Sequence, residues 1–289
     1  MIGRRWFTPW LFLLPALAIL GIFYWWPIAN TMVLAFTDAH AIRGGSFNGL
    51  ENFKRLFSDE LFVNSLRNSF LFMIGVVPAL VLLPLLLAVL ANAKLPGMGF
   101  FRTVFFSPVV ASMVVAALLW SWMLRTDGLV NWVLTRLRVI NEPLGWLTDP
   151  KLALISVMVV TVWKGLGYYM IFYLAGLQNI PTQLYEAVKL DGANAIRSFW
   201  SITVPLLRPS MVLVATVTAI SAIKVFTEVY VLTGGGPNRA SQTMVPYIYE
   251  RGFSGMETGY ASAMSLMLFV IVLGATLLTA RITRRRAQS

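Results

Sequence analysis

The sequence predicts an all-α membrane protein with six transmembrane helices, and three observations lead to that prediction. Of the 289 residues, 58% are hydrophobic and 12% are charged, with a mean hydropathy of +0.73. Soluble domains average roughly 45–50% apolar and about 25% charged residues. Six segments are apolar over about 20 residues, the length that a helix needs to cross a bilayer. A polar, helix-prone stretch at residues 184–209 separates two of these segments.

The residue types exclude several kinds of chemistry. The chain has no cysteine and one histidine, His40, so it offers no thiol nucleophile and little for a zinc site. It also lacks the GxxxxGK[ST] pattern of a phosphate-binding loop. If the chain takes part in nucleotide-driven transport, the ATPase is therefore another polypeptide. We therefore predict no catalytic residue, metal or cofactor in this chain. The net charge of +11 is spread over loops and the C-terminus, which favours anionic lipid over nucleic acid.

The apolar segments define the expected spans, taken in order along the chain. They lie at roughly residues 10–36, 68–90, 104–123, 153–177, 210–232 and 260–280. Arg4 and Arg5 precede the first segment as in a signal peptide, but its apolar run exceeds the usual length of about 7–15 residues, so we interpret it as an uncleaved anchor. Pro15 and Pro27 would bend this helix without forbidding it, because neighbouring helices can satisfy the freed carbonyls.

An even number of spans puts both termini on one side of the membrane. That side carries eleven basic residues and the opposite side carries ten, so the count alone is nearly equal. The eleven lie in shorter segments close to helix ends, where the positive-inside rule works best. They include Arg4, Arg5, Lys94 and the arginines at 281, 284, 285 and 286. We therefore expect both termini in the cytoplasm.

The loops on the outer side are not plain coil. Residues 52–62 and 129–140 show helical spacing of apolar side chains, which predicts short helices at the outer membrane interface. The third outer loop, 233–259, opens with three glycines and a proline, so the chain must leave the preceding helix sharply.

The polar stretch between the fourth and fifth spans reads as two short helices. Pro181 and Thr182 supply a helix start, and Gly192 closes that helix in the left-handed conformation. A second helix begins near Asn194, and Pro205 precedes the return to the membrane. The first helix suits docking into a partner's groove, but it could equally pack on its own bundle. The residue pattern alone leaves both interpretations open.

The same stretch resembles a known motif. Residues 186–188 (EAV), Gly192 and residues 202–205 (ITVP) are similar to the EAA loop of ABC importer membrane subunits, written EAA-x3-G-x9-I-x-L-P. Val188 replaces the usual alanine and Val204 the usual leucine, both mild changes of bulk. Further similar segments are FLLPA at 12–16, GLENF at 49–53, GFFRT at 99–103, VWKG at 162–165, AGLQ at 175–178, VLTGGGP at 231–237 and GYASA at 259–263. The chain thereby resembles carbohydrate permeases of the MalF/UgpA type, in a compact form.

The resemblance implies a type I ABC importer fold over a single domain, 1–289, in a bacterial inner (cytoplasmic) membrane. It implies a second, similar permease subunit in a heterodimer, two ATP-binding cassette subunits that bind ATP and magnesium, and an external solute-binding protein that delivers a sugar-like solute. Residues 178–209 would then form the cytoplasmic coupling loop. The implied coupling residues are Glu186, Ala187, Leu190, Asp191, Gly192 and Pro205.

Charged and aromatic residues inside the spans are candidates for the solute path. Lys164 lies in the fourth span and should face the bundle interior, because exposing it to lipid would cost at least about 2.5–3.5 kcal/mol. Lys224 and Glu228 are four residues apart on the predicted fifth span and could pair on one face. Aromatic rings could stack on sugar rings, although packing is their commoner role. The path candidates are Trp163, Lys164, Tyr168, Tyr169, Lys224, Glu228 and Tyr230.

Two other functions remain to be weighed against the importer. A stand-alone, ion-coupled carrier predicts repeated halves and discontinuous helices at the midplane, which the sequence does not show. A membrane-embedded enzyme or scaffold requires catalytic pairs that are absent from the sequence. The solute stays open at this point, because a disaccharide, an oligosaccharide and glycerol-3-phosphate are all compatible with these residues.

Overall fold

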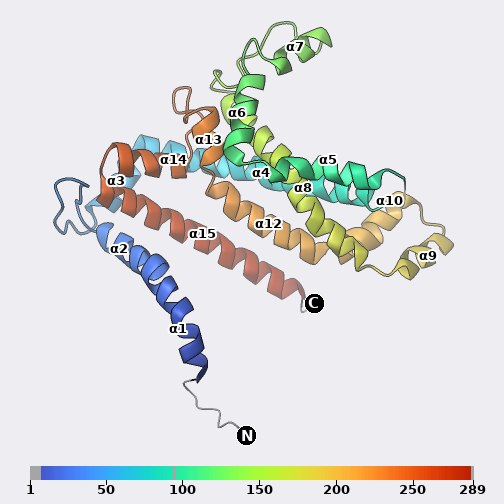
Figure 1. Cartoon of the computed structure of the whole chain (residues 1–289), viewed down its shortest axis with the longest axis horizontal. Coiled ribbons are helices and arrows are strands. Elements are labelled where there is room, and N and C mark those ends of the chain that lie inside the picture. Colours follow the sequence, from blue (N-terminus) through green and yellow to red (C-terminus); the bar gives the residue numbers. More distant parts are fainter. Residues whose placement is uncertain (1–7, 94–95, 288–289) are drawn as a thin grey trace. The chain divides into compact units, whose positions relative to one another are not determined.

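The structure is a computed structural model that describes residues 8–93 and 96–287, with side chains for 9–93 and 96–277. Arg4, Arg5, Lys94 and the C-terminal arginine side chains, which entered the orientation prediction, lie outside these ranges. The elements, labelled in Figure 1, are α1 (Thr8–Leu20), π-helix η1 (Gly21–Trp25), α2 (Trp26–Leu34), α3 (Glu51–Ser58), α4 (Glu60–Ala91), α5 (Met98–Val110), α6 (Met113–Met123), α7 (Leu129–Arg136), α8 (Ala153–Gln178), α9 (Thr182–Leu190), α10 (Ala195–Ser198), π-helix η2 (Phe199–Thr203), α11 (Val204–Leu206), α12 (Arg208–Ile223), α13 (Thr227–Leu232), α14 (Met244–Tyr249), π-helix η3 (Glu250–Ser254) and α15 (Thr258–Ala287).

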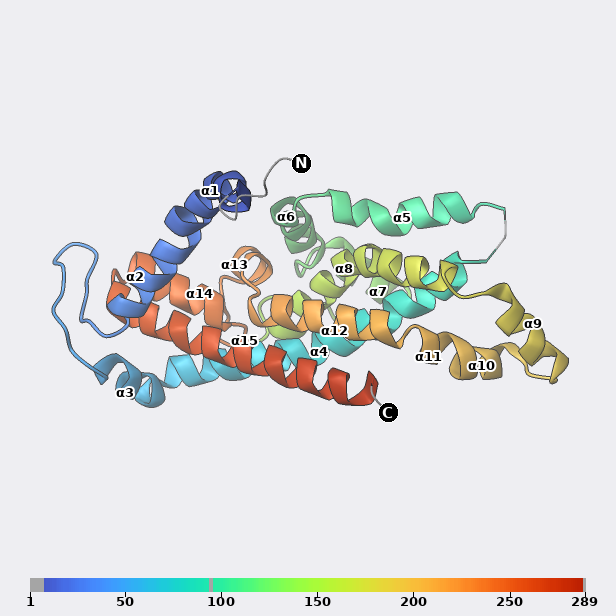
Figure 2. The same cartoon turned by 90° about the horizontal axis from the view of Figure 1, so that it is seen from below.

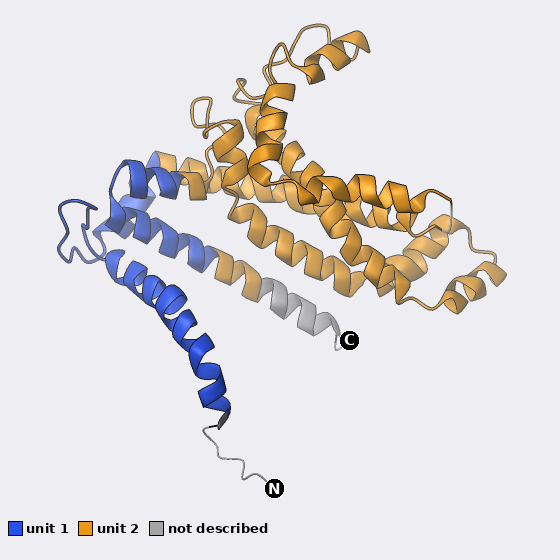
Figure 3. Cartoon of the chain, viewed as in Figure 1, with its two compact units in different colours: residues 1–60, 247–271 blue, residues 61–246, 272–289 orange. Residues whose placement is uncertain are grey.

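The described residues are helical apart from loops and two isolated bridges, Thr37 with Phe47 and His40 with Gly44. Four helices are long and apolar enough to cross a membrane, and this number rises to six if each of two bent helix pairs is one span. The all-α fold predicted from composition is thus confirmed. Contacts divide the chain into two compact units, residues 1–60 with 247–271 and residues 61–246 with 272–289 (Figure 3). The single importer domain over 1–289 stays a prediction.

Unit 1 contains an apolar helix that buries nothing. In the stretch Pro9–Leu34, which joins α1, η1 and α2, no described residue is buried. The side chains of Phe12, Trp25 and Trp26 are each at least 70% exposed. A helix that is apolar on all sides needs lipid or another protein around it.

Unit 1 also holds an enclosed polar cluster. The Asp59 carboxylate accepts hydrogen bonds from the hydroxyls of Tyr247 (2.6 Å) and Tyr260 (2.7 Å). The Arg55 guanidinium lies 4.0 Å from the centre of the Tyr260 ring and forms a 2.9 Å ion pair with Glu257. Burial, together with the hydrogen bond to Asp59, raises the pKa of Tyr247 to about 12. These contacts join α3 to α14 and to the start of α15.

The core of unit 2 is built around α8. Its buried residues Val157, Val160 and Tyr173 belong to one apolar cluster with Phe72 of α4 and Val214 of α12. Figures 1 and 2 show α8 lying along α5 and α12, and the residue contacts agree.

The closest approach to α8 comes from α5. A Cβ atom at Gly167 would lie 2.1 Å from the carbonyl oxygen of Phe105. Only glycine permits this approach, because a methyl group would meet rigid backbone rather than a movable side chain.

The structure differs from the predicted third span, 104–123. Two helices, α5 and α6, replace it, and they are bent by 99°. Ala111 at the break is extended, with φ −66° and ψ 143°. Pro108 lacks a backbone N–H and weakens the last turn of α5. The freed carbonyls of Pro108 and Ala111 accept hydrogen bonds from Lys164, so a contact from a distant segment stabilises a break that apolar periodicity does not reveal.

The predicted fifth span, 210–232, is also interrupted. Helix α12 ends at Ile223 and α13 begins at Thr227, so Lys224 and Glu228 do not share a helical face and their predicted pairing is wrong. The Thr243 hydroxyl donates a 3.4 Å hydrogen bond to the carbonyl of Val225 inside the break. This loop contact again supplies a partner that local sequence cannot indicate.

The short helices predicted in two of the loops are confirmed with shifted bounds, and their place on the outer side stays a prediction. The apolar spacing at 52–62 corresponds to α3 and the first turn of α4, and the spacing at 129–140 corresponds to α7. Helix α4 begins at Glu60, well before the predicted start of the second span at residue 68, because Phe62 and Ser65 are buried and continue the helix.

Candidate functional site

The polar stretch folds into the two helices that its sequence predicts. Pro181 is extended (ψ 132°) and precedes α9, which ends at Leu190 with Asp191 as its C-cap. Gly192 follows with φ +76°, a left-handed conformation that favours glycine. The Asn194 side chain accepts a 2.8 Å hydrogen bond from the backbone N–H of Arg197 and caps α10. Local turn chemistry therefore sets both helix boundaries.

One face of helix α9 contacts the rest of unit 2. The hydroxyls of Tyr185 and Thr203 lie 3.0 Å apart. Both residues, with Lys189, line a cavity of about 290 Å³ beneath the helix. Because Thr203 is buried in η2, just before α11 and α12, this hydrogen bond connects α9 to the helices that return into the bundle.

The other face of α9 is open. No residue of α9 is buried, and Leu190 is 90% exposed. Glu186, Ala187 and Asp191 are exposed as well, so acidic groups flank an apolar surface at the end of unit 2 (Figures 1 and 2). Pro205 is the exception among the predicted coupling residues. It lies in α11 and lines a separate apolar groove with Arg208 and Met211.

A second site is a partly open cavity of about 290 Å³ between helices of unit 2. Its walls come from α4, α5, α8 and α12, together with the start of α6 and the break around Val225. Most of the lining is apolar. Its polar side chains are Thr161, Lys164, Tyr168, Tyr169, Thr218, Ser221 and Glu228.

Two ionisable side chains of opposite charge line this cavity. The Lys164 ammonium donates hydrogen bonds to the carbonyls of Pro108 (3.0 Å) and Ala111 (2.7 Å). Glu228 lies in the first turn of α13, where a carboxylate is favoured by the helix dipole. The prediction that Lys164 faces the bundle interior is confirmed.

The remaining path candidates lie outside the cavity lining. Trp163 packs edge-on against Trp120, with ring centroids 5.4 Å apart. Tyr230 is 51% exposed and stacks on Phe226 at 5.1 Å. Lys224 ends α12 and is exposed. Sequence reasoning missed Thr161, Thr218 and Ser221, because hydroxyl residues in apolar helices give no distinctive signal.

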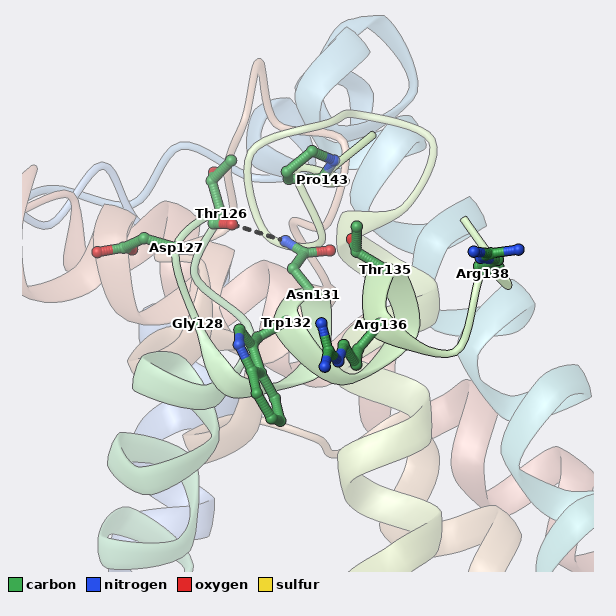
Figure 4. A pocket seen from close by; sticks show the side chains of 9 residues that line it. All are labelled: Thr126, Asp127, Gly128, Asn131, Trp132, Thr135, Arg136, Arg138 and Pro143. Atoms are coloured by element: carbon green, nitrogen blue, oxygen red, sulfur yellow. Dashed lines mark hydrogen bonds between the residues drawn. The ribbon is translucent and has the colours of Figure 1, made fainter. Parts of the chain in front are cut away.

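A third, more open hollow of about 730 Å³ lies in the loop around α7 (Figure 4). Asn131 at its centre is 2% exposed and donates hydrogen bonds to the carbonyls of Arg125, Thr126 and Leu144. Its side-chain oxygen accepts from Leu144 N–H and Trp146 Nε1. A hydrogen bond from Arg125 lowers the pKa of the exposed Asp127 carboxyl. Asn131 therefore holds the loop together and is not free to bind a ligand.

Helices of membrane-spanning length, an exposed polar loop and a cavity between the helices fit a membrane transport component. The sequence profile of the family described as "Binding-protein-dependent transport system inner membrane component" matches residues 61–288. The chain belongs to this family.

The chain is similar to named relatives along almost all of its length. It is 37% identical to the lactose transport system permease protein LacF of Rhizobium radiobacter, over 91% of this chain and 89% of that protein. It is 34% identical to the sn-glycerol-3-phosphate transport system permease protein UgpA of Agrobacterium fabrum, over 96% and 95% of the two chains.

A solved structure shares the fold. It is a bacterial alginate ABC transporter in complex with an alginate pentasaccharide-bound periplasmic protein. One of its chains superposes with a TM-score of 0.86 at 24% identity, covering 100% of this chain and 97% of that chain.

The protein is therefore a permease subunit of an ABC importer, a multi-pass component of the inner membrane that is not itself catalytic. The expected resemblance to sugar and glycerol-phosphate permeases is confirmed, and the alternative of a stand-alone ion-coupled carrier is wrong.

Proposed function

We propose that this chain translocates a sugar or related solute across the membrane, driven by ATP hydrolysis in separate subunits that dock on α9. The observation that supports the proposal is the open face of α9, where exposed Leu190 lies beside the acidic groups of Glu186 and Asp191. A short helix with an apolar centre and a charged border suits a groove in a partner protein.

The proposed complex contains a second permease subunit in a heterodimer, two ATP-binding cassette subunits that hold ATP and magnesium, and an external solute-binding protein. The unburied stretch Pro9–Leu34 supports a further membrane partner, because lipid or protein must cover its apolar side chains. Both termini and the 178–209 loop would then lie in the cytoplasm.

The contacts of α9 suggest how nucleotide-driven motion reaches the solute. Closure of the ATPase subunits would displace α9, and the Tyr185–Thr203 hydrogen bond would pass that motion to η2. Helix α12 follows along the chain and lines the internal cavity through Thr218 and Ser221. Motion of α12 would thus change the access to the cavity.

The solute is proposed to be a di- or oligosaccharide or a related molecule such as glycerol-3-phosphate. The similar permeases named for lactose and for sn-glycerol-3-phosphate transport support this range. The hydroxyl and tyrosine side chains that line the cavity suit hydrogen bonding to solute hydroxyls.

The test is solute-stimulated ATPase activity of the complex reconstituted with its co-encoded partner subunits. We expect Glu186→Ala to lower the stimulation at least tenfold while the subunits still assemble, because Glu186 is exposed and contributes nothing to the chain's own core. Gln183→Ala changes an equally exposed residue of α9 outside the EAA-like segment and should retain stimulation. Unchanged stimulation in Glu186→Ala would contradict the docking role of α9.

A further inference from the structure

The internal cavity carries a charge pattern that bears on its solute. Its lining includes one ammonium group, Lys164, and one carboxyl group, Glu228. No other lysine, arginine or acidic residue lines it among the described residues. Lys224, the other basic path candidate, is exposed just after α12 and does not line the cavity.

The Lys164 ammonium is already largely occupied. An ammonium group has three N–H donors, and two of them are used by the carbonyls of Pro108 and Ala111 at 3.0 and 2.7 Å. A phosphate group needs several charge-assisted hydrogen bonds to replace its hydration. One remaining donor is a poor match for an anion with three free oxygens.

Glu228 further disfavours an anion. It lies in the first turn of α13, so the positive end of this helix dipole already has a carboxylate beside it. A carboxylate repels a second anion that enters the same cavity. Its two oxygens are good acceptors for hydroxyl groups, which a sugar supplies on adjacent carbons.

The rest of the polar lining suits hydroxyl groups. Thr218 and Ser221 of α12 face the same cavity as Tyr168 and Tyr169 of α8, and the two tyrosine rings lie edge to face with centroids 5.1 Å apart. Hydroxyl side chains can donate and accept, and aromatic rings provide apolar surface for the C–H face of a pyranose.

We propose that this cavity selects a neutral polyhydroxylated solute, a disaccharide in particular, over a phosphorylated solute. The selection depends on the Glu228 carboxyl group and on the engagement of Lys164 by backbone carbonyls. It rests on the proposed function, because the cavity must lie on the solute path, and it decides between two solute classes that the relatives leave open.

The experiment measures equilibrium binding to the complete membrane complex, purified without the solute-binding protein and without ATP. The probes are lactose, maltose, sucrose, trehalose and sn-glycerol-3-phosphate at equal concentrations. We expect at least one disaccharide to bind tenfold or more tightly than sn-glycerol-3-phosphate. Tighter or equal binding of sn-glycerol-3-phosphate relative to every disaccharide would overturn the proposal.

Variants then test whether residues of the cavity cause the preference for a disaccharide. Glu228→Gln keeps the shape and removes the charge, so the ratio of disaccharide to sn-glycerol-3-phosphate affinity should fall severalfold. Glu142→Gln makes the same chemical change in an exposed loop and should leave the ratio unchanged. If Glu228→Gln prevents assembly, Ser221→Ala serves instead and should weaken disaccharide binding at least threefold. An unchanged ratio in an assembled Glu228→Gln complex, or unchanged disaccharide binding in Ser221→Ala, also overturns the proposal.

This binding measurement needs no ATP hydrolysis, so its outcome is independent of the coupling experiment that tests the proposed function. Loss of coupling in Glu186→Ala together with preferred binding of sn-glycerol-3-phosphate would retain the importer and reject the neutral solute. Intact coupling in Glu186→Ala would reject the docking role of α9 whatever the cavity binds.

Discussion

Helix α9 and the cavity that holds Lys164 are two polar regions of unit 2, and they differ in how far their polar groups are exposed to solvent. On α9, Glu186 and Asp191 point to solvent and the apolar Leu190 is 90% exposed. In the cavity, Lys164 is held by two backbone carbonyls and α4, α5, α8 and α12 surround it. Substitutions on α9 should therefore change function with little loss of stability, whereas substitutions at the cavity walls should change both.

The largest effect is expected at the close contact between α8 and α5. Gly167→Ala places a methyl group 2.1 Å from the Phe105 carbonyl oxygen and 2.8 Å from the Phe106 Cα, so α5 and α8 must separate. Overpacking of this kind costs about 1–3 kcal/mol and occasionally more. We expect a clear fall in the yield of folded complex and in its Tm, measured by thermal unfolding in detergent.

Gly99→Ala is the matched control, because no atom lies within 4 Å of its Cβ position in α5. The exchange should leave the Tm unchanged or raise it, since alanine is the better helix former. Equal Tm values for the two variants would show that the α5–α8 contact is looser than the structure indicates.

Lys164→Met should have the next largest effect. It keeps the bulk of the side chain and leaves the carbonyls of Pro108 and Ala111 without their donor. A hydrogen bond to a charged group contributes about 1.5–3 kcal/mol, so the loss of both bonds should lower the Tm by several degrees. Lys151→Met, in an exposed loop, should leave the Tm unchanged, and a similar fall in both variants would argue against a specific role for Lys164.

At the end of α9, a change in backbone conformation should reduce function more than it reduces stability. Gly192→Ala forces a residue with a Cβ into φ +76°, which costs about 1–2 kcal/mol. The strain falls on an exposed turn, so solute-stimulated ATPase activity should fall further than the Tm does. Gly192→Asn tolerates the left-handed conformation better and should restore most of the stimulation. A lower Tm with normal stimulation would contradict the contrast between the two regions.

The polar cluster of unit 1 sharpens the contrast, because it joins two buried phenols to the charged groups of Asp59 and Arg55. The folded-state pKa of Tyr247 is about 12, above the value of about 10 expected for the unfolded chain. The folded state therefore binds more protons between these two values, and its stability is full below pH 10 and falls as the pH rises towards 12. Tyr247→Phe should lose less stability over this range than the native chain, in denaturation at stepped alkaline pH. Equal losses would show that Tyr247 titrates as an exposed phenol.

The sequence alone determined the features that depend on composition and on neighbouring residues. The apolar content set the class, and the apolar runs located the helices that could span a membrane. The boundaries of α9 and α10 followed from Pro181, Gly192 and Asn194, because turn and capping preferences act within a few residues. The EAA-like segment led to the family that residues 61–288 belong to.

Only the tertiary structure decided where the third and fifth predicted spans break and which side chains share the cavity. The bend between α5 and α6 depends on Lys164, 53 and 56 residues away from the two carbonyls that it binds. The break at Val225 has its partner in Thr243. Trp163 and Tyr230 looked as suitable for solute as Tyr168, yet they lie outside the cavity lining. In a chain with this many apolar residues, periodicity shows that a helix exists but not which of its faces meets lipid, protein or solute, because all of those faces look alike in the sequence.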